Sequence, residues 1–150
     1  MKLSSLILAA MIPTSALAGP DRLSVLLGSE HFGATREFQE FNPGVFLTWE
    51  ERVFDYSIGT FYNSYEDVSV LGAIGYDYEI AKELEVGVFA GVAYYPGEGD
   101  QFSVSAGDMV PVAGVQTRYR NLFAQWIPAD GDSVDSVLTF GLTFELNKQD

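Results

Sequence analysis

The chain of 150 residues contains no cysteine and a single histidine. Without cysteine there is no disulfide framework, no thiol catalysis and no zinc–thiolate site. One histidine cannot build a His-rich metal site, so we expect neither a metal nor an organic cofactor. Basic residues are also scarce, with 8 Lys and Arg against 21 Asp and Glu and a formal net charge of −13. Because a phosphate backbone recruits basic surfaces, this balance excludes nucleic acid as a partner.

Long apolar runs are missing as well, which excludes a helical membrane span. The longest apolar stretch, Leu3–Ile12, follows Lys2 and precedes the small-x-small sequence Ala16-Leu17-Ala18. This pattern is typical of a cleaved secretory signal peptide, and the alternative is a retained anchor or buried helix. We therefore predict a signal peptide at residues 1–18 and a single mature domain at 19–150.

Strict alternation of apolar with small or polar residues is the strongest pattern in the chain. From Leu138 to Leu146, Leu and Phe alternate with Thr, Gly and Glu. Side chains alternate between the two faces of a strand, so such a segment has one apolar face. Seven other segments resemble it: 22–29, 44–50, 53–62, 68–78, 84–94, 109–118 and 121–127. Eight strands, an even number, predict an all-β, eight-stranded antiparallel barrel.

The breaks between these segments differ in length. Short turns at 51–52, 80–83 and 120 alternate with the longer segments 30–43, 95–108 and 128–134, and 63–67 is short. Long loops at one end and short turns at the other are typical of outer-membrane barrels. Strands whose large apolar residues stand opposite Gly, Thr and Glu favour lipid outside a narrow lumen. We expect a monomer in the outer membrane of a Gram-negative bacterium; the alternative is a soluble barrel of lipocalin type.

The last strand also predicts a partner. Its residues Thr139-x-Gly141-x-x-Phe144-x-Leu146 resemble the C-terminal signal read by the outer-membrane assembly machinery, although the chain continues to Asp150. We therefore expect that machinery to fold the chain into the membrane.

Two chemically capable side chains fall at the long-loop end of this topology. His31 begins the first long loop, and Ser64 begins the second. A base beside a hydroxyl can support acyl transfer. The alternative is a solvated loop histidine and an ordinary serine, and the chain has no G-x-S-x-G elbow.

Several motifs together resemble the lipid A palmitoyltransferase (PagP) family. The segment 61–65, FYNSY, resembles the family's F-x-D-S-W, and Gly75-Tyr76 follows eleven residues after the serine, as in its A-G-Y-G-W strand. The segments 110–113 (VPVA) and 127–129 (IPA) resemble L-P-L-A and I-P-G, with the two prolines 17 residues apart. His31 stands where the family has its loop histidine, before a turn at Asn42-Pro43-Gly44.

This resemblance implies an eight-stranded enzyme that moves a palmitoyl chain from a phospholipid to lipid A without a cofactor. The family's catalytic histidine, aspartate and serine match His31, Asn63 and Ser64, and its floor glycine, which limits acyl length, matches Gly75. The implied acyl tunnel is lined by Phe61, Leu71, Ala73, Phe89, Ala113 and Phe123. Lateral gaps for lipid would be flanked by Pro111 and Pro128 on one side and Pro43 on the other.

The chain departs from the family where asparagine replaces the aspartate at position 63 and Leu26 replaces a gap proline. The family's N-terminal amphipathic helix is missing as well. Three functions remain open: a lipid acyltransferase, a non-catalytic barrel whose acidic loops serve interaction or envelope stability, and a lipid deacylase.

Overall fold

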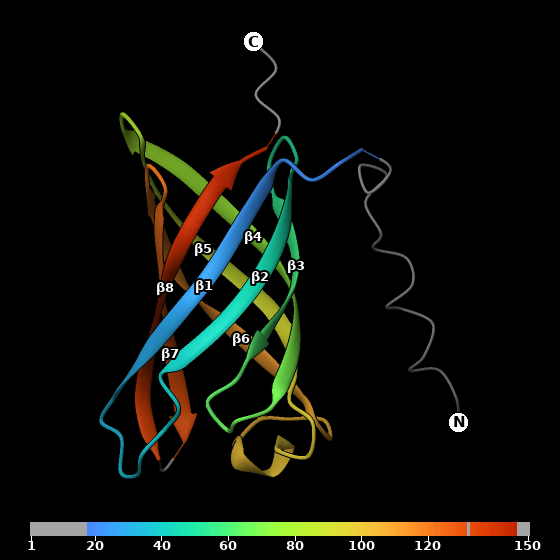
Figure 1. Cartoon of the computed structure of the whole chain (residues 1–150), viewed down its shortest axis with the longest axis vertical. Coiled ribbons are helices and arrows are strands. Elements are labelled where there is room, and N and C mark those ends of the chain that lie inside the picture. The colour runs from blue at the N-terminus through green and yellow to red at the C-terminus, as the bar shows by residue number, and fades with distance from the viewer. Residues whose placement is uncertain (1–17, 132, 147–150) are drawn as a thin grey trace.

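Eight antiparallel strands close into a barrel in which each strand pairs with its neighbour in sequence and the last pairs with the first (Figure 1). The computed structural model describes residues 18–131 and 133–146, without the side chains of 130 and 131. The strands are β1 (Arg22–Phe32), β2 (Phe41–Glu50), β3 (Asp55–Tyr62), β4 (Val68–Ala81), β5 (Leu84–Tyr94), β6 (Met109–Tyr119), β7 (Leu122–Gly131) and β8 (Val134–Glu145). The prediction of an eight-stranded antiparallel barrel is confirmed; all of the predicted signal peptide except Ala18 lies outside the described residues.

Two segments predicted as loops are partly strand. β1 continues to Phe32 and β2 begins at Phe41, which shortens the predicted loop 30–43 to residues 33–40. β7 and β8 likewise occupy most of 128–134. The ladder between β1 and β8 runs to the pair Phe32 and Ser136. Antiparallel pairing thus continues these strands into residues whose sequence does not alternate between apolar and polar.

The two ends of the barrel differ. The loops 33–40, 63–67 and 95–108 lie at one end, and 95–108 contains a single 3-10 turn, η3 (Gly99–Gln101). Short turns lie at the other end, where β1 begins and β8 ends (Figure 1). We call these the loop end and the turn end.

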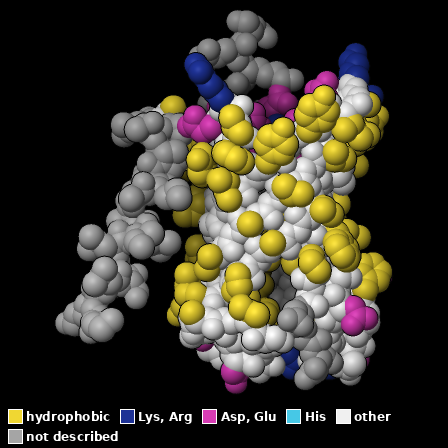
Figure 2. Space-filling view, turned by 180° about the vertical axis from the view of Figure 1, so that it is seen from behind, with side chains coloured by type: hydrophobic (Ala, Val, Ile, Leu, Met, Phe, Trp, Pro, Cys, Tyr) yellow, Lys and Arg dark blue, Asp and Glu magenta, His cyan; other side chains and the backbone are white. Residues whose placement is uncertain are grey.

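Apolar side chains cover the outside of the barrel, and few are buried inside (Figure 2). Among the described residues, the buried apolar side chains are Leu26, Phe89, Ala93 and Val110, whereas large apolar residues of every strand are exposed. Each strand thus presents its larger apolar face outward and its smaller or polar face to the lumen. None of the described residues forms a helix long and apolar enough to cross a membrane.

Candidate functional site

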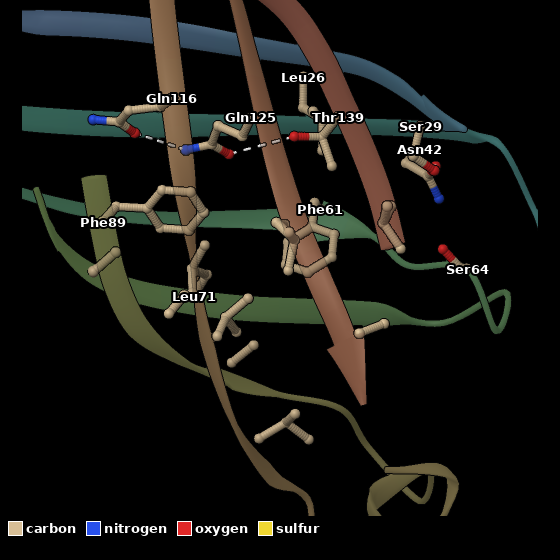
Figure 3. Close-up of a pocket in the computed structure, with 18 of the residues that line it drawn as sticks. Leu26, Ser29, Asn42, Phe61, Ser64, Leu71, Phe89, Gln116, Gln125 and Thr139 are labelled. Atoms are coloured by element: carbon tan, nitrogen blue, oxygen red, sulfur yellow. Dashed lines mark hydrogen bonds between the residues drawn. The ribbon is translucent and has the colours of Figure 1, made fainter. Parts of the chain in front are cut away.

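A cavity of about 480 Å³ occupies the lumen and reaches the loop end. Its walls are inward-facing side chains, and Figure 3 shows Phe61, Leu71 and Phe89 turned toward the same space. Ala73 and Phe123 also line it, as the sequence predicts. Ala113 lines it too, although on β6 it is an exposed residue between the more buried Val112 and Gly114.

The inward face of β6 shows how the lumen changes along its length. From the loop end to the turn end it carries Val110, Val112, Gly114, Gln116 and Arg118. These inward side chains thus change from apolar to small, then to an amide and finally to a charged group. Along β6, the half of the lumen near the loops is therefore apolar, and the half near the turns is polar.

Hydrogen-bonded side chains form a floor between these halves. Gln116 donates through Nε2 to Asp77 Oδ1 at 2.8 Å. Gln125 Nε2 donates to Gln116 Oε1 at 3.0 Å, as Figure 3 shows. The hydroxyl of Thr139 donates to Gln125 Oε1 at 3.4 Å. Gly75 is buried at this level, as the family resemblance implies for a floor glycine.

Ion pairs fill the lumen below the floor. Arg118 lies 2.9 Å from Asp77, 2.8 Å from Glu85 and 3.9 Å from Asp55. Arg22 forms a second cluster, 2.7 Å from Glu50. Their partners compensate these charges, and Arg22, Glu85 and Arg118 also line a polar pocket at the turn end.

A β-bulge directs His31 into the cavity. The register of β1 shifts between Leu26 and Gly28 against both neighbours. Against β8, Leu27 is an extra residue, whereas against β2 the extra residue lies on β2, at Asn42-Pro43. Before the bulge the inward residues have even numbers, and after it they are Ser29 and His31. Such an insertion reverses which face the following side chains occupy, and without it His31 would face outward.

The imidazole of His31 is held tightly at the cavity mouth. Its side chain is 4% exposed and stacks on the ring of Phe38, with centroids 4.5 Å apart and planes 7° from parallel. Nδ1 lies 3.9 Å from Glu40 Oε1. In the described part of the chain, Nδ1 of His31 is also the one buried side-chain nitrogen or oxygen without a hydrogen-bond partner.

The two remaining residues implied by the family resemblance have different environments. Ser64 lines the cavity at its mouth, near Ser29 and Asn42 (Figure 3). Asn63 is fully buried behind the turn, and its amide donates to Ser69 Oγ at 2.9 Å. Its Oδ1 accepts the backbone N–H groups of Tyr65 and Asp67. Asn63 therefore closes the turn that carries Ser64 and is not among the residues that line the cavity.

Aromatic rings from the three loops pack around the mouth. Tyr65 contacts Phe38, Tyr95 and Phe102 in edge-on or T-shaped pairs. Arg36 lies 4.9 Å from the centroid of Phe38 and 5.3 Å from that of Tyr65. Burial raises the pKa of both the Tyr65 and Tyr95 phenols, so they stay neutral and act as packing surfaces.

The wall has a seam between β6 and β7. These strands pair only from Val115 opposite Trp126 to Tyr119 opposite Leu122, so their loop-end halves are not paired with each other. Pro111 and Pro128 stand in these unpaired halves; both are exposed and both line the cavity. Neither can donate a ladder hydrogen bond, because proline has no N–H. The barrel surface is hollowed toward its loop end in Figure 2.

Pro43 has a different setting. It stands opposite the β1 bulge, between the pairs Leu26–Gly44 and Gly28–Phe41. Pairing of β1 with β2 resumes beyond it, and Ser29 N donates to Glu40 O at 2.9 Å. The irregularity at Pro43 is therefore shorter than the seam between β6 and β7.

Sequence reasoning missed Phe38, Glu40, Gln116 and Gln125. The glutamines were visible as polar residues inside apolar segments, but their contact depends on how the strands are staggered around the barrel. No group of three metal-ligating side chains occurs within residues 18–131 and 133–146, as far as their side chains are described.

Comparison of the chain with models of known protein families gives no match. Comparison with curated proteins likewise finds no similar sequence.

Proposed function

We propose that this protein is a lipid acyltransferase of the lipid A palmitoyltransferase type, working in the outer membrane. The observation that carries the proposal is a dead-end apolar cavity with an imidazole and a hydroxyl at its mouth. The cavity fits one acyl chain: from Ser69 to Gly75 the strand descends about 15 Å, at ~3.3 Å per residue and a tilt of ~40°. The polar floor stops an apolar chain at Gly75, because burying the chain deeper would displace hydrogen bonds and ion pairs.

The outer surface supports the membrane location. Val86, Val88 and Val92 on β5, and their counterparts on the other strands, are exposed in a barrel that buries few apolar side chains among its described residues. In water such a surface costs about 25 cal/mol for each Å² of apolar area. Lipid removes that cost, and the closed ladder leaves few backbone groups facing it. A secretory signal peptide at residues 1–18 delivers the chain to the envelope.

The reaction is a direct transfer between two oxygens. Nε2 of His31 takes the proton of the acceptor hydroxyl on lipid A while that oxygen attacks the ester carbonyl of the phospholipid. A new carbon–oxygen bond forms, the bond to the glycerol oxygen breaks, and the proton passes from the imidazole to the leaving oxygen. Ser64 donates to the carbonyl oxygen as it becomes negative. Electrons and protons balance without a cofactor.

The seam between β6 and β7 supplies the route from the bilayer. Its exposed prolines line the cavity, so an acyl chain can pass sideways between the unpaired strand halves. The headgroup then stays at the membrane surface, close to the loop end.

The lumen favours the transferase over the non-catalytic alternative. A barrel that serves only as a scaffold fills its lumen with polar networks. In this chain the ion pairs lie below Gln116, and the cavity above is lined mainly by apolar side chains, with polar groups such as Ser29 and Asn42 at its mouth. A deacylase would use the same mouth, with water accepting the acyl group, so only the product distinguishes it from the transferase.

The test is a lipid A mass spectrum from Gram-negative cells that lack their own palmitoyltransferase. The wild type, His31→Ala and Ser64→Ala are expressed at equal outer-membrane levels. Ser105→Ala is the control, because this loop serine bonds to the Gly99 carbonyl and does not line the cavity.

We expect one added acyl mass in the wild type and in the control, and none in the two mouth variants. Unchanged lipid A with a folded wild type would reject the transferase. Loss of an acyl mass would identify the deacylase.

A further inference from the structure

We infer that Glu40 orients the imidazole of His31, supplying the carboxylate that position 63 lacks. This inference rests on the proposed function only for its effect on turnover. Three observations at the cavity mouth support the contact between Glu40 and His31. They are the buried Nδ1 atom, the backbone that fixes Glu40, and the ring stacked on the imidazole.

The first observation is the environment of Nδ1. This atom is buried, lacks a hydrogen-bond partner and lies 3.9 Å from Glu40 Oε1. An unpaired buried nitrogen costs about 1–3 kcal/mol. Glu40 is 58% exposed and can change rotamer, so a shift of about 1 Å brings its carboxylate into hydrogen-bond range of Nδ1.

The second observation is that the backbone already fixes the pair. The carbonyl of Glu40 accepts the N–H of Ser29 at 2.9 Å, which ties the last loop residue to β1 two residues before His31. The same segment carries Phe38, whose ring lies parallel to the imidazole. The stacked ring restricts rotation of the His31 imidazole, so Nδ1 and Nε2 cannot exchange positions.

The consequence concerns the proton of the neutral imidazole. A carboxylate that accepts from Nδ1–H fixes the tautomer in which Nε2 has no proton. Nε2 is then the free base that the acyl transfer requires. In this arrangement Glu40 is a positioning residue, because it acts on the reaction through His31.

One histidine in the chain makes the test direct. The mature protein is labelled with ¹⁵N-histidine, extracted from outer membranes in detergent and held at a pH where the imidazole is neutral. Long-range ¹H–¹⁵N spectra then report which nitrogen carries the proton. Glu40→Ala is compared with Glu37→Ala, an exposed glutamate of the same loop.

We expect the proton on Nδ1 in the wild type and in Glu37→Ala, and on Nε2 for most molecules of Glu40→Ala. A proton on Nε2 in the wild type overturns the inference. So does an Nδ1 proton that persists in Glu40→Ala.

Turnover is the second readout. Because Glu40 is partly exposed, we expect Glu40→Ala to lower kcat on the order of tenfold with little change in KM. An inactive wild type would reject the proposed function, and the tautomer would still decide the role of Glu40. An active wild type with a tautomer independent of Glu40 would reject the inference alone.

Discussion

Nε2 of Gln116 lies 3.2 Å from the point that a Cβ atom on Gly75 would occupy. Gly75 belongs to β4 and Gln116 to β6, and the two meet where the apolar cavity ends. A larger residue at position 75 therefore extends into the cavity from its floor. This pair therefore sets the depth of the cavity.

Replacing Gly75 with methionine is expected to shorten the acyl chain that the protein transfers. The methionine side chain fills the deepest part of the cavity. A longer acyl chain then no longer fits with its ester group at the mouth. The measurement is the mass added to lipid A when donors of several chain lengths are offered. Gly72→Met is the matched control, since a Cβ at Gly72 has no neighbour within 4 Å and that residue is exposed.

If Gly75→Met and Gly72→Met transfer acyl chains of equal length, this cavity does not determine the length of the acyl chain. A milder variant, Gly75→Ala, is expected to give a smaller shift. Its Cβ requires Gln116 to move by only a few tenths of an ångström.

Closing the seam between β6 and β7 is expected to slow transfer. The double variant Pro111→Ala, Pro128→Ala restores two N–H donors to the unpaired strand halves. Additional pairing narrows the lateral route, while His31 and Ser64 at the mouth stay unchanged. The initial rate of transfer should fall several-fold, whereas Pro96→Ala in the loop 95–108 should match the wild type. A rate that does not change would show that lipid reaches the cavity by another route.

Much of this arrangement follows from alternation alone. The period-two pattern predicted all eight strands, and it assigned Phe61, Leu71 and Phe89 to the inside because their neighbours are apolar and outward. Ala113 came from the family resemblance instead, and it lines the cavity from an exposed position on β6.

The inward direction of His31 could not be predicted from the same pattern. One extra residue, Leu27, reverses the faces that follow it. The adjacent leucines 26 and 27, followed by Gly28, interrupt the alternation and in retrospect mark the bulge. The contacts of Glu40 with His31 and of Gln116 with Gln125 depend on loop conformation and strand stagger, which local sequence does not encode.

Removal of Arg118 is expected to destabilise the barrel strongly. Its guanidinium is 13% exposed and neutralises Asp77 and Glu85, so Arg118→Met leaves these carboxylates without their cation. Breaking a buried pair in this way costs about 3–5 kcal/mol. The control is Arg120→Met, because Arg120 is 63% exposed and solvent screens its pair with Glu83.

Urea unfolding in lipid vesicles, followed by tryptophan fluorescence, measures both free energies of unfolding. Similar losses for the two variants would mean that the cluster around Arg118 is hydrated and contributes little.

Asn63 is expected to act through the turn that it closes. Its Oδ1 accepts two backbone N–H groups and its Nδ2 donates to Ser69, all in a fully buried position. Asn63→Ala leaves these groups unpaired and should cost about 1–3 kcal/mol in the free energy of unfolding. The same variant should lower the transfer rate, because Ser64 is the next residue. Asn63→Asp keeps both acceptor bonds, and the Ser69 hydroxyl can turn to donate, so it should preserve stability and rate. A rate increase of tenfold or more in Asn63→Asp, measured beside the wild type in the same vesicles, would instead show that a carboxylate here takes part in the chemistry.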